Sequence, residues 1–211
     1  TGYYNTATGR AALLLNTKGY ENTAEGMQAL ASNTTASQNT AIGNNALFTQ
    51  SYSNNNSAWI CGNVAVGYSA LYSNQPTSLS TGIWNTALGT NALYSNTIGN
   101  GNTASGFYAL QNNSIEGFNT ATGSNALFYN SKGNENSAFG ASALQNNSSA
   151  SQNTAIGSSA LANHSYNPGF AWNSDNVAVG FQALYANHPT SVTNGCINTA
   201  VGSTALMSNT T

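Results

Sequence analysis

Few side chains in this sequence are of types that could do acid–base, nucleophilic or metal chemistry. Its 211 residues include five acids, three Lys or Arg and two His. Enzymes that cleave glycosidic bonds need a pair of carboxylates at a defined separation, whereas Glu116, Glu135 and Asp175 have no acidic neighbour in the sequence. Serine is abundant, but no His–acid pair accompanies it to make it a nucleophile. We therefore expect no enzyme activity, no metal site and no cofactor.

The low charge also excludes whole classes of partner. Charged residues make up 4% of the chain, against about a quarter in an ordinary soluble domain. Three cations cannot neutralise a run of nucleic-acid phosphates. No stretch approaches the ~20 apolar residues that span a bilayer, and no signal-peptide pattern opens the sequence. We expect neither nucleic-acid binding nor a membrane span.

The side chains best suited to binding gather in four segments, 50–62, 74–84, 163–175 and 187–197. These segments hold all three Trp, all three Pro, both His and both Cys. Aromatic faces suit sugar rings or an apolar patch of a partner, and recognition is often carried by loops on a rigid scaffold. The alternative is that the rings only pack the long loops onto the body of the protein. The candidate ligand-contact residues are Tyr52, Trp59, Trp84, Tyr166, Phe170 and Trp172.

The elements that position these segments follow from a repeat. The pattern Asn-x-Ala-x-Gly-x-x-Ala-Leu occurs eleven times at spacings of 17 to 24 residues, which is typical of a solenoid. The order of spacings restarts after 114 residues, so residues 1–211 form one array, with a six-rung super-repeat over 1–115 and an incomplete one over 116–211. The leading asparagines are Asn5, Asn22, Asn39, Asn63, Asn85, Asn102, Asn119, Asn136, Asn153, Asn176 and Asn198.

Each unit predicts one rung of an all-β, parallel β-solenoid. Asn, Thr, Ser and Gly are weak helix formers, whereas in Asn39–Gly43 alternate side chains would face opposite sides of a strand. A tight turn follows Gly43, and Ala46–Phe48 begins a second short strand. We expect the motif Ala and the Ala-Leu pair to fill the interior, and the leading Asn to stack from rung to rung as an amide ladder. Eleven rungs at the strand spacing of ~4.8 Å make a rod about 50 Å long.

Two variable positions lie on the outer face of the expected strand. The residue before the motif Gly is mostly apolar, as in Ile42 and Val66, but it is Glu25 in one rung, which a closed interior would not accept. Because the interior is thin, this apolar column predicts contact between chains, as a homotrimer or an end-to-end filament. Thr follows the leading Asn in eight rungs. Such a Thr column favours β-structure and could also order water against ice.

A second Asn lies eleven residues after the first in nine of the eleven rungs. Its side-chain chemistry predicts a turn in which it caps its own backbone. The same stretch of the rung holds most of the seven Asn-x-Ser/Thr sequons, so N-glycosylation would place a row of sugars along one edge of the rod. These sequons begin at Asn33, Asn55, Asn112, Asn146, Asn147, Asn163 and Asn209.

The two cysteines cannot pair within one straight rod. Cys61 and Cys196 are seven rungs apart, which is about 34 Å at the strand spacing and far beyond the reach of a disulfide. We expect free thiols or bridges between chains, so cysteine usage leaves the redox compartment open.

The segments 39–47 and 153–161, which read Asn-Thr-Ala-Ile-Gly-x-x-Ala-Leu, resemble the repeats in the head domains of trimeric autotransporter adhesins. They are similar also to the arrays of phage tail-fibre-like proteins. The resemblance covers all eleven rungs, although rungs of 17 to 24 residues are longer than the adhesin repeat. It implies a left-handed parallel β-roll, a homotrimer, and a location on an extracellular or virion surface.

These observations predict a non-catalytic structural or adhesive fibre segment of an extracellular appendage or virion, a rigid rod that displays aromatic loops. Its partners would be further copies of itself and a cell-surface glycan or receptor. One alternative is the subunit of a self-assembling extracellular filament, which the sequons would allow to be glycosylated. Another is a solenoid that binds ice or carbohydrate.

Overall fold

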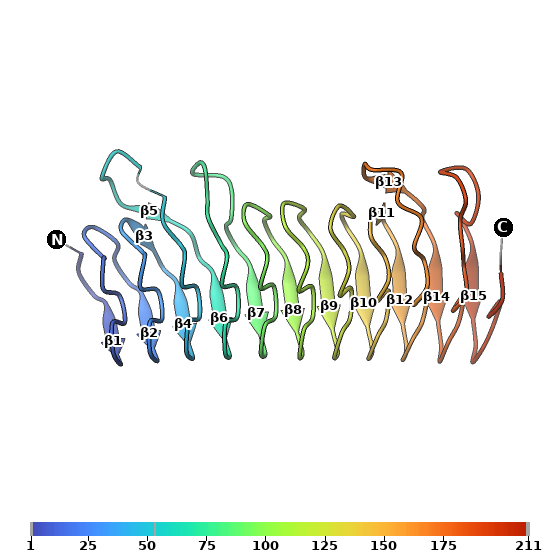
Figure 1. Ribbon diagram of the computed structural model, residues 1–211, viewed down its shortest axis with the longest axis horizontal. Coiled ribbons are helices and arrows are strands. Elements are labelled where there is room, and N and C mark those ends of the chain that lie inside the picture. The colour runs from blue at the N-terminus through green and yellow to red at the C-terminus, as the bar shows by residue number, and fades with distance from the viewer. Residues whose placement is uncertain (1, 53, 210–211) are drawn as a thin grey trace.

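Eleven short parallel strands, one for each motif, form a single sheet that runs the length of a rod (Figure 1). The computed structural model describes residues 2–52 and 54–209. These residues contain no helix, so the predicted all-β parallel solenoid is confirmed. The strands of the sheet are β1 (Thr6–Thr8), β2 (Thr23–Glu25), β4 (Thr40–Ile42), β6 (Val64–Val66), β7 (Thr86–Leu88), β8 (Thr103–Ser105), β9 (Thr120–Thr122), β10 (Ser137–Phe139), β12 (Thr154–Ile156), β14 (Val177–Val179) and β15 (Thr199–Val201).

The strands pair in register, so each motif position stacks on itself along the rod. Ala24 of β2 pairs with Ala41 of β4, which pairs with Ala65 of β6. These side chains are fully buried, and so are the Ala and Leu of the Ala-Leu pair, as at Ala46 and Leu47. The interior is therefore built from the three residues expected, and it is as thin as the sequence predicts.

The motif Gly is required both by its backbone conformation and by the closeness of the next rung. Gly43 has a φ of +127°, a conformation that side chains with a β-carbon rarely adopt. A β-carbon at this position would also lie 2.6 Å from the carbonyl oxygen of Gly67 in the next rung. Any larger residue would push the two rungs apart.

The Ala-Leu segment is not a strand, so the prediction of a second strand over Ala46–Phe48 is wrong. Residues 44–49 form successive turns, with left-handed backbone at Asn45 (φ 58°) and Leu47 (φ 51°), and the same two positions are left-handed in every rung. A β-strand needs φ between roughly −160° and −60°. The N–H groups are satisfied nonetheless, because Leu47 donates to the Ala70 carbonyl of the next rung (3.0 Å). We call the surface formed by residues between the motif Gly and the second Asn the turn face.

The leading asparagines stack as an amide ladder inside the rod. The Oδ1 atom of Asn119 accepts hydrogen bonds from the backbone N–H (3.0 Å) and the Nδ2 atom (3.2 Å) of Asn136 in the next rung. Nδ2 of Asn136 also donates to the Ala150 carbonyl (2.9 Å). Both Asn119 and Asn136 are fully buried, so each amide replaces the water that it lost on folding with neighbours above, below and beside it.

The second Asn bonds the backbone of its own turn in most rungs, as the sequence predicts, and it also forms a second ladder, which the sequence did not predict. Asn130 is fully buried, and its Nδ2 atom donates to Oδ1 of Asn113 in the preceding rung (3.0 Å) and to the Gly133 carbonyl (2.8 Å). The first ladder reaches the same oxygen, since Asn119 donates to Gly133 at 2.9 Å. Two asparagines thus hold one buried carbonyl. The carbonyls held in this way belong to Gly19, Ala36, Gly82, Gly99, Glu116, Gly133, Ala150 and Gly195.

The long connections leave the rod beside two small parallel sheets and protrude from one side of it (Figure 1). One sheet pairs β3 (Ala36–Ser37) with β5 (Trp59–Ile60), and the other pairs β11 (Ala150–Ser151) with β13 (Trp172–Asn173). Across residues 2–52 and 54–209, no helix is long and apolar enough to cross a membrane.

Candidate functional site

Two of the predicted ligand-contact tryptophans are packed into the protein and not displayed. Trp59 is only 6% exposed and packs in a cluster with Ala36, Cys61 and Ile83. The ring of Tyr52 meets Trp59 edge-on, with the ring centroids 5.6 Å apart. The aromatic rings of this loop therefore pack it against the rod.

The equivalent loop of the second super-repeat is packed in the same way. Trp172 is 6% exposed and meets the ring of Tyr166 edge-on at 5.9 Å. The imidazole of His164 also packs against Trp172, with the ring centroids 5.6 Å apart. The connections 50–62 and 163–175 thus each have a small aromatic core of their own.

The remaining two candidates are exposed but lie apart from each other. Trp84 is 63% exposed at a corner of the rod, where its ring covers Gly62, whose β-carbon would lie 3.2 Å from the ring. Phe170 is 57% exposed in the loop of the second super-repeat. The six predicted aromatic residues therefore do not form one binding surface.

The sequon asparagines do not form an accessible row. Asn33 and Asn147 are fully buried members of the second ladder, and Asn209 is half-buried with its Nδ2 atom bonded to Asn187. A sugar on these nitrogens would displace the ladder. Asn112, Asn146 and Asn163 are half-buried, with Asn146 donating to Asn163 at 2.6 Å, and Asn55 alone is exposed.

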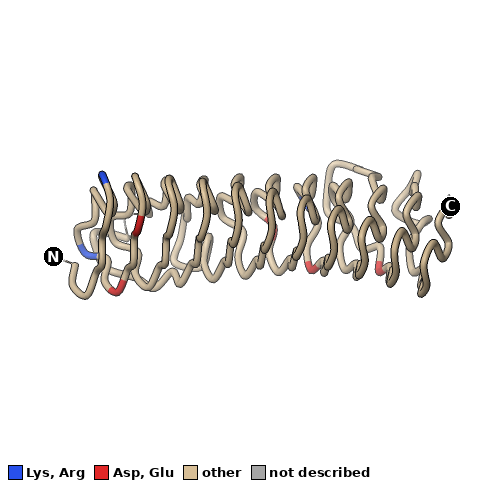
Figure 2. Tube along the Cα trace, turned by 90° about the horizontal axis from the view of Figure 1, so that it is seen from below, with Lys and Arg blue, Asp and Glu red and all other residues tan. Residues whose placement is uncertain are grey.

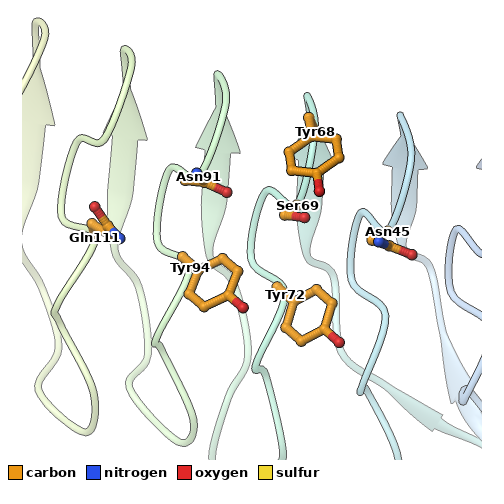
Figure 3. A pocket seen from close by; sticks show the side chains of 7 residues that line it. All are labelled: Asn45, Tyr68, Ser69, Tyr72, Asn91, Tyr94 and Gln111. Carbon is orange, nitrogen blue, oxygen red and sulfur yellow. The ribbon is translucent and has the colours of Figure 1, made fainter.

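A hollow lies on the turn face, where the sequence had not placed a site. It is a groove of about 500 Å³, and we call it the tyrosine groove (Figure 3). Its lining residues are Asn45, Tyr68, Ser69, Tyr72, Asn91, Tyr94 and Gln111. The side chains come from four successive rungs and are all uncharged, so the groove can offer amides, hydroxyls and aromatic rings to a ligand.

A stack of aromatic rings forms one wall of the tyrosine groove. Tyr72 and Tyr94 are parallel within 8°, with centroids 5.1 Å apart, and Phe48 continues the stack at 5.2 Å from Tyr72. The signal for this wall is present in the sequence, because an aromatic residue directly follows the motif Leu in five rungs. These residues are Phe48, Tyr72, Tyr94, Phe128 and Tyr185. Which side chains would face them depends on the turn geometry, which the sequence did not reveal.

Two rungs replace the second-ladder Asn, and both replacements are fully or almost fully buried. Gln50 donates to the sulfur of Cys61 (2.8 Å), and burial raises the pKa of that thiol to about 12. His164 interacts through Nδ1 with Asn187 (3.2 Å), while its Nε2 atom has no partner among the described residues. Burial lowers the pKa of His164 to about 4. Both Cys61 and Cys196 are free thiols, and Cys61 is buried.

Charged residues are few along the rod (Figure 2), and none lines the tyrosine groove. Residues 2–52 and 54–209 contain no group of three or more His, Cys, Asp or Glu side chains that could hold a metal ion. No family model, curated protein or solved structure matches the chain.

Replacing Trp172 by Ala should destabilise the protein, whereas the same change at Trp84 should not. The first removes a ring that is 6% exposed and the second a ring that is 63% exposed. Deleting a buried aromatic side chain costs about 3 kcal/mol, and a surface change is usually within about 0.5 kcal/mol. Urea denaturation followed by circular dichroism measures both. Equal midpoints for the two variants would contradict the packed arrangement of the loop.

His164 should make stability fall as the pH falls from about 6.5 to about 4. Its pKa is lowered to about 4 in the folded state from an ordinary 6.5, so the unfolded chain binds more protons in this range and acid favours unfolding. The full effect is about 3 kcal/mol, complete below pH ~4 and absent above pH ~6.5.

The control uses the residue that the other rungs carry. A His164→Asn variant should lose this part of the pH dependence, while His188→Asn, at an exposed position, should retain it. Denaturation midpoints of the wild type and both variants, measured between pH 4 and pH 7, show which of them keep the pH dependence. Identical profiles for wild type and His164→Asn would show that the buried imidazole has no such role.

Proposed function

We propose that the protein is a non-catalytic structural segment of an extracellular or virion fibre, and that its rods associate with one another through the outer face of the eleven-stranded sheet. The observation that carries this proposal is an apolar column left on that face. Each strand turns its middle Ala inward and its flanking residues outward, and the third residue of most strands is apolar. The exposed members are Ile42 (37%), Leu88 (39%), Phe139 (42%), Ile156 (43%) and Val201 (70%).

The thin interior gives a physical reason for association. A rung buries two Ala and one Leu side chain, and small cores of this kind contribute little apolar burial for the chain that they order. Covering the outer column with a second copy would remove further apolar surface from water along the length of the rod. Glu25 is the only charged residue in the column, so little electrostatic repulsion opposes the contact.

Rigidity supports a role as a fibre segment. The sheet, the turn face and both Asn ladders are all bonded from one rung to the next, so bending the rod would strain four sets of hydrogen bonds together. The resemblance to adhesin heads and tail-fibre arrays supports the same role and the surface location.

Ice binding through the same face is the second candidate, and the Thr column favours it. Eight of the eleven strands begin with Thr at the strand spacing. The neighbouring column is uneven, however, because it contains both large residues such as Phe139 and Leu88 and small ones such as Ser105. A flat water lattice fits such a surface less well than an interlocking protein surface does.

Light scattering on the dilute protein tests association. We expect a homotrimer or a larger series of assemblies, and we expect an Ile156→Lys variant to dissociate, because it places a charge within the apolar column. Ser158→Lys is the matched control, since Ser158 is exposed two residues away on the turn face, and it should assemble like wild type. A stable species of 21.7 kDa for the wild-type protein would overturn the proposal.

A further inference from the structure

We infer that the tyrosine groove binds an extended, uncharged β-1,4-linked polysaccharide, which lies along the turn face parallel to the rod axis. This inference does not depend on the proposed association, because the groove lies on the turn face and the apolar column lies on the sheet. Three features carry it: the line that the hollows follow, the chemistry of the lining, and the repeat distance of the rungs.

The hollows of the turn face follow one line along the rod. A second hollow, of about 310 Å³, is lined near the N-terminal end by Arg10, Ala11, Leu14, Met27 and Gln28. Its residues occupy the same motif positions as those of the tyrosine groove, namely the two positions after the motif Gly and the position after the motif Leu. Because the rungs stack in register, equal motif positions lie on a line parallel to the axis. A ligand that follows this line must be a long, straight chain.

The lining matches the hydroxyl groups of a neutral sugar. Asn45, Asn91 and Gln111 bring amides, which can donate and accept hydrogen bonds at the same time. The buried Oδ1 atom of Asn45 has no partner among the described residues, so this acceptor is not used by the protein itself. No charged side chain lines the tyrosine groove, which disfavours phosphorylated, sulfated or uronic-acid chains.

The aromatic wall repeats at the distance that a straight polysaccharide needs. Tyr72 and Tyr94 stack at 5.1 Å, so a ring edge and a hydroxyl recur from one rung to the next, and Phe48 continues the stack beyond the groove at 5.2 Å from Tyr72. An extended β-1,4-linked chain advances by nearly this distance for each sugar, whereas an α-1,4-linked chain coils. Successive sugars of the first would meet equivalent groups on successive rungs. Tyr68, which is 54% exposed beside this wall, adds an open ring face.

The groove exists before any ligand arrives. Its volume of about 500 Å³ lies within the usual range for binding pockets, about 300–1,000 Å³. Its residues sit on turns that are bonded from rung to rung, as in the bond from Asn91 N–H to the Tyr68 carbonyl (2.9 Å). Binding would therefore order few protein groups and lose little conformational entropy.

Isothermal titration calorimetry with defined oligosaccharides tests the inference. We expect saturable binding of cellohexaose or chitohexaose, weaker binding of the corresponding disaccharide, and none of maltohexaose, the α-1,4-linked control. The two β-linked probes distinguish glucose chains from N-acetylglucosamine chains. Absence of binding by both hexaoses at millimolar concentration, or equal binding of maltohexaose, would overturn the inference.

A variant in which both Asn45 and Asn91 are replaced by Ala locates the site. Ala is tolerated at this motif position, because Ala11 occupies it in the first rung with the same left-handed backbone (φ 59°). We expect the double variant to bind about tenfold more weakly, as two lost hydrogen bonds would dictate, and to keep the wild-type assembly state. Phe118→Ala, which removes a 66% exposed ring at a corner of the rod, should bind like wild type. Unchanged affinity of the double variant would overturn the assignment of the groove.

Discussion

A backbone carbonyl at one corner of most rungs must be given hydrogen-bond donors inside the rod, and the rest of the structure satisfies this requirement. Away from water, such an oxygen must be given hydrogen-bond donors, and two asparagines supply them in most rungs, as Asn119 and Asn130 do for Gly133. Each amide is also bonded to its counterparts in neighbouring rungs. The asparagines that bond the carbonyl thus also fix the distance between neighbouring rungs. The small Ala and Leu side chains fill the space that remains inside the rod.

The two exceptions to the second ladder show how the rod accommodates its long loops. In rungs three and nine the chain departs on a long connection, and the leading Asn donates instead to the Ser37 or the Ser151 carbonyl. Gln50 and His164 take the place of the second Asn there, with longer or broader side chains. Trp59 packs beside Cys61, the partner of Gln50, and Trp172 packs against His164; each tryptophan is 6% exposed. The two buried tryptophans thus pack these two loops against the rod.

The sheet could be predicted from the sequence because the alternation around the motif Ala admits one inward face, and the eleven exact repeats fix the register. The turn face could not be predicted, because a leucine such as Leu47 gives no sign in the sequence of a left-handed backbone (φ 51°). The tyrosine groove depends on that turn. The second ladder was hidden for a different reason: an Asn such as Asn130 bonds both the carbonyl of its own turn and the Asn of the preceding rung, and the residue type predicts only the first bond. Only the neighbouring rung decides.

Hydrogen exchange of the Asn side-chain amides, followed by nuclear magnetic resonance, tests the central role of the two ladders most directly. The Nδ2 protons of buried ladder residues such as Asn119 and Asn130 should exchange orders of magnitude more slowly than those of half-buried surface residues such as Asn91 and Asn125, because they open only when the rungs separate. Comparable exchange rates for the two groups would contradict the account, since the ladders would then be neither dry nor coupled to the stacking of the rungs.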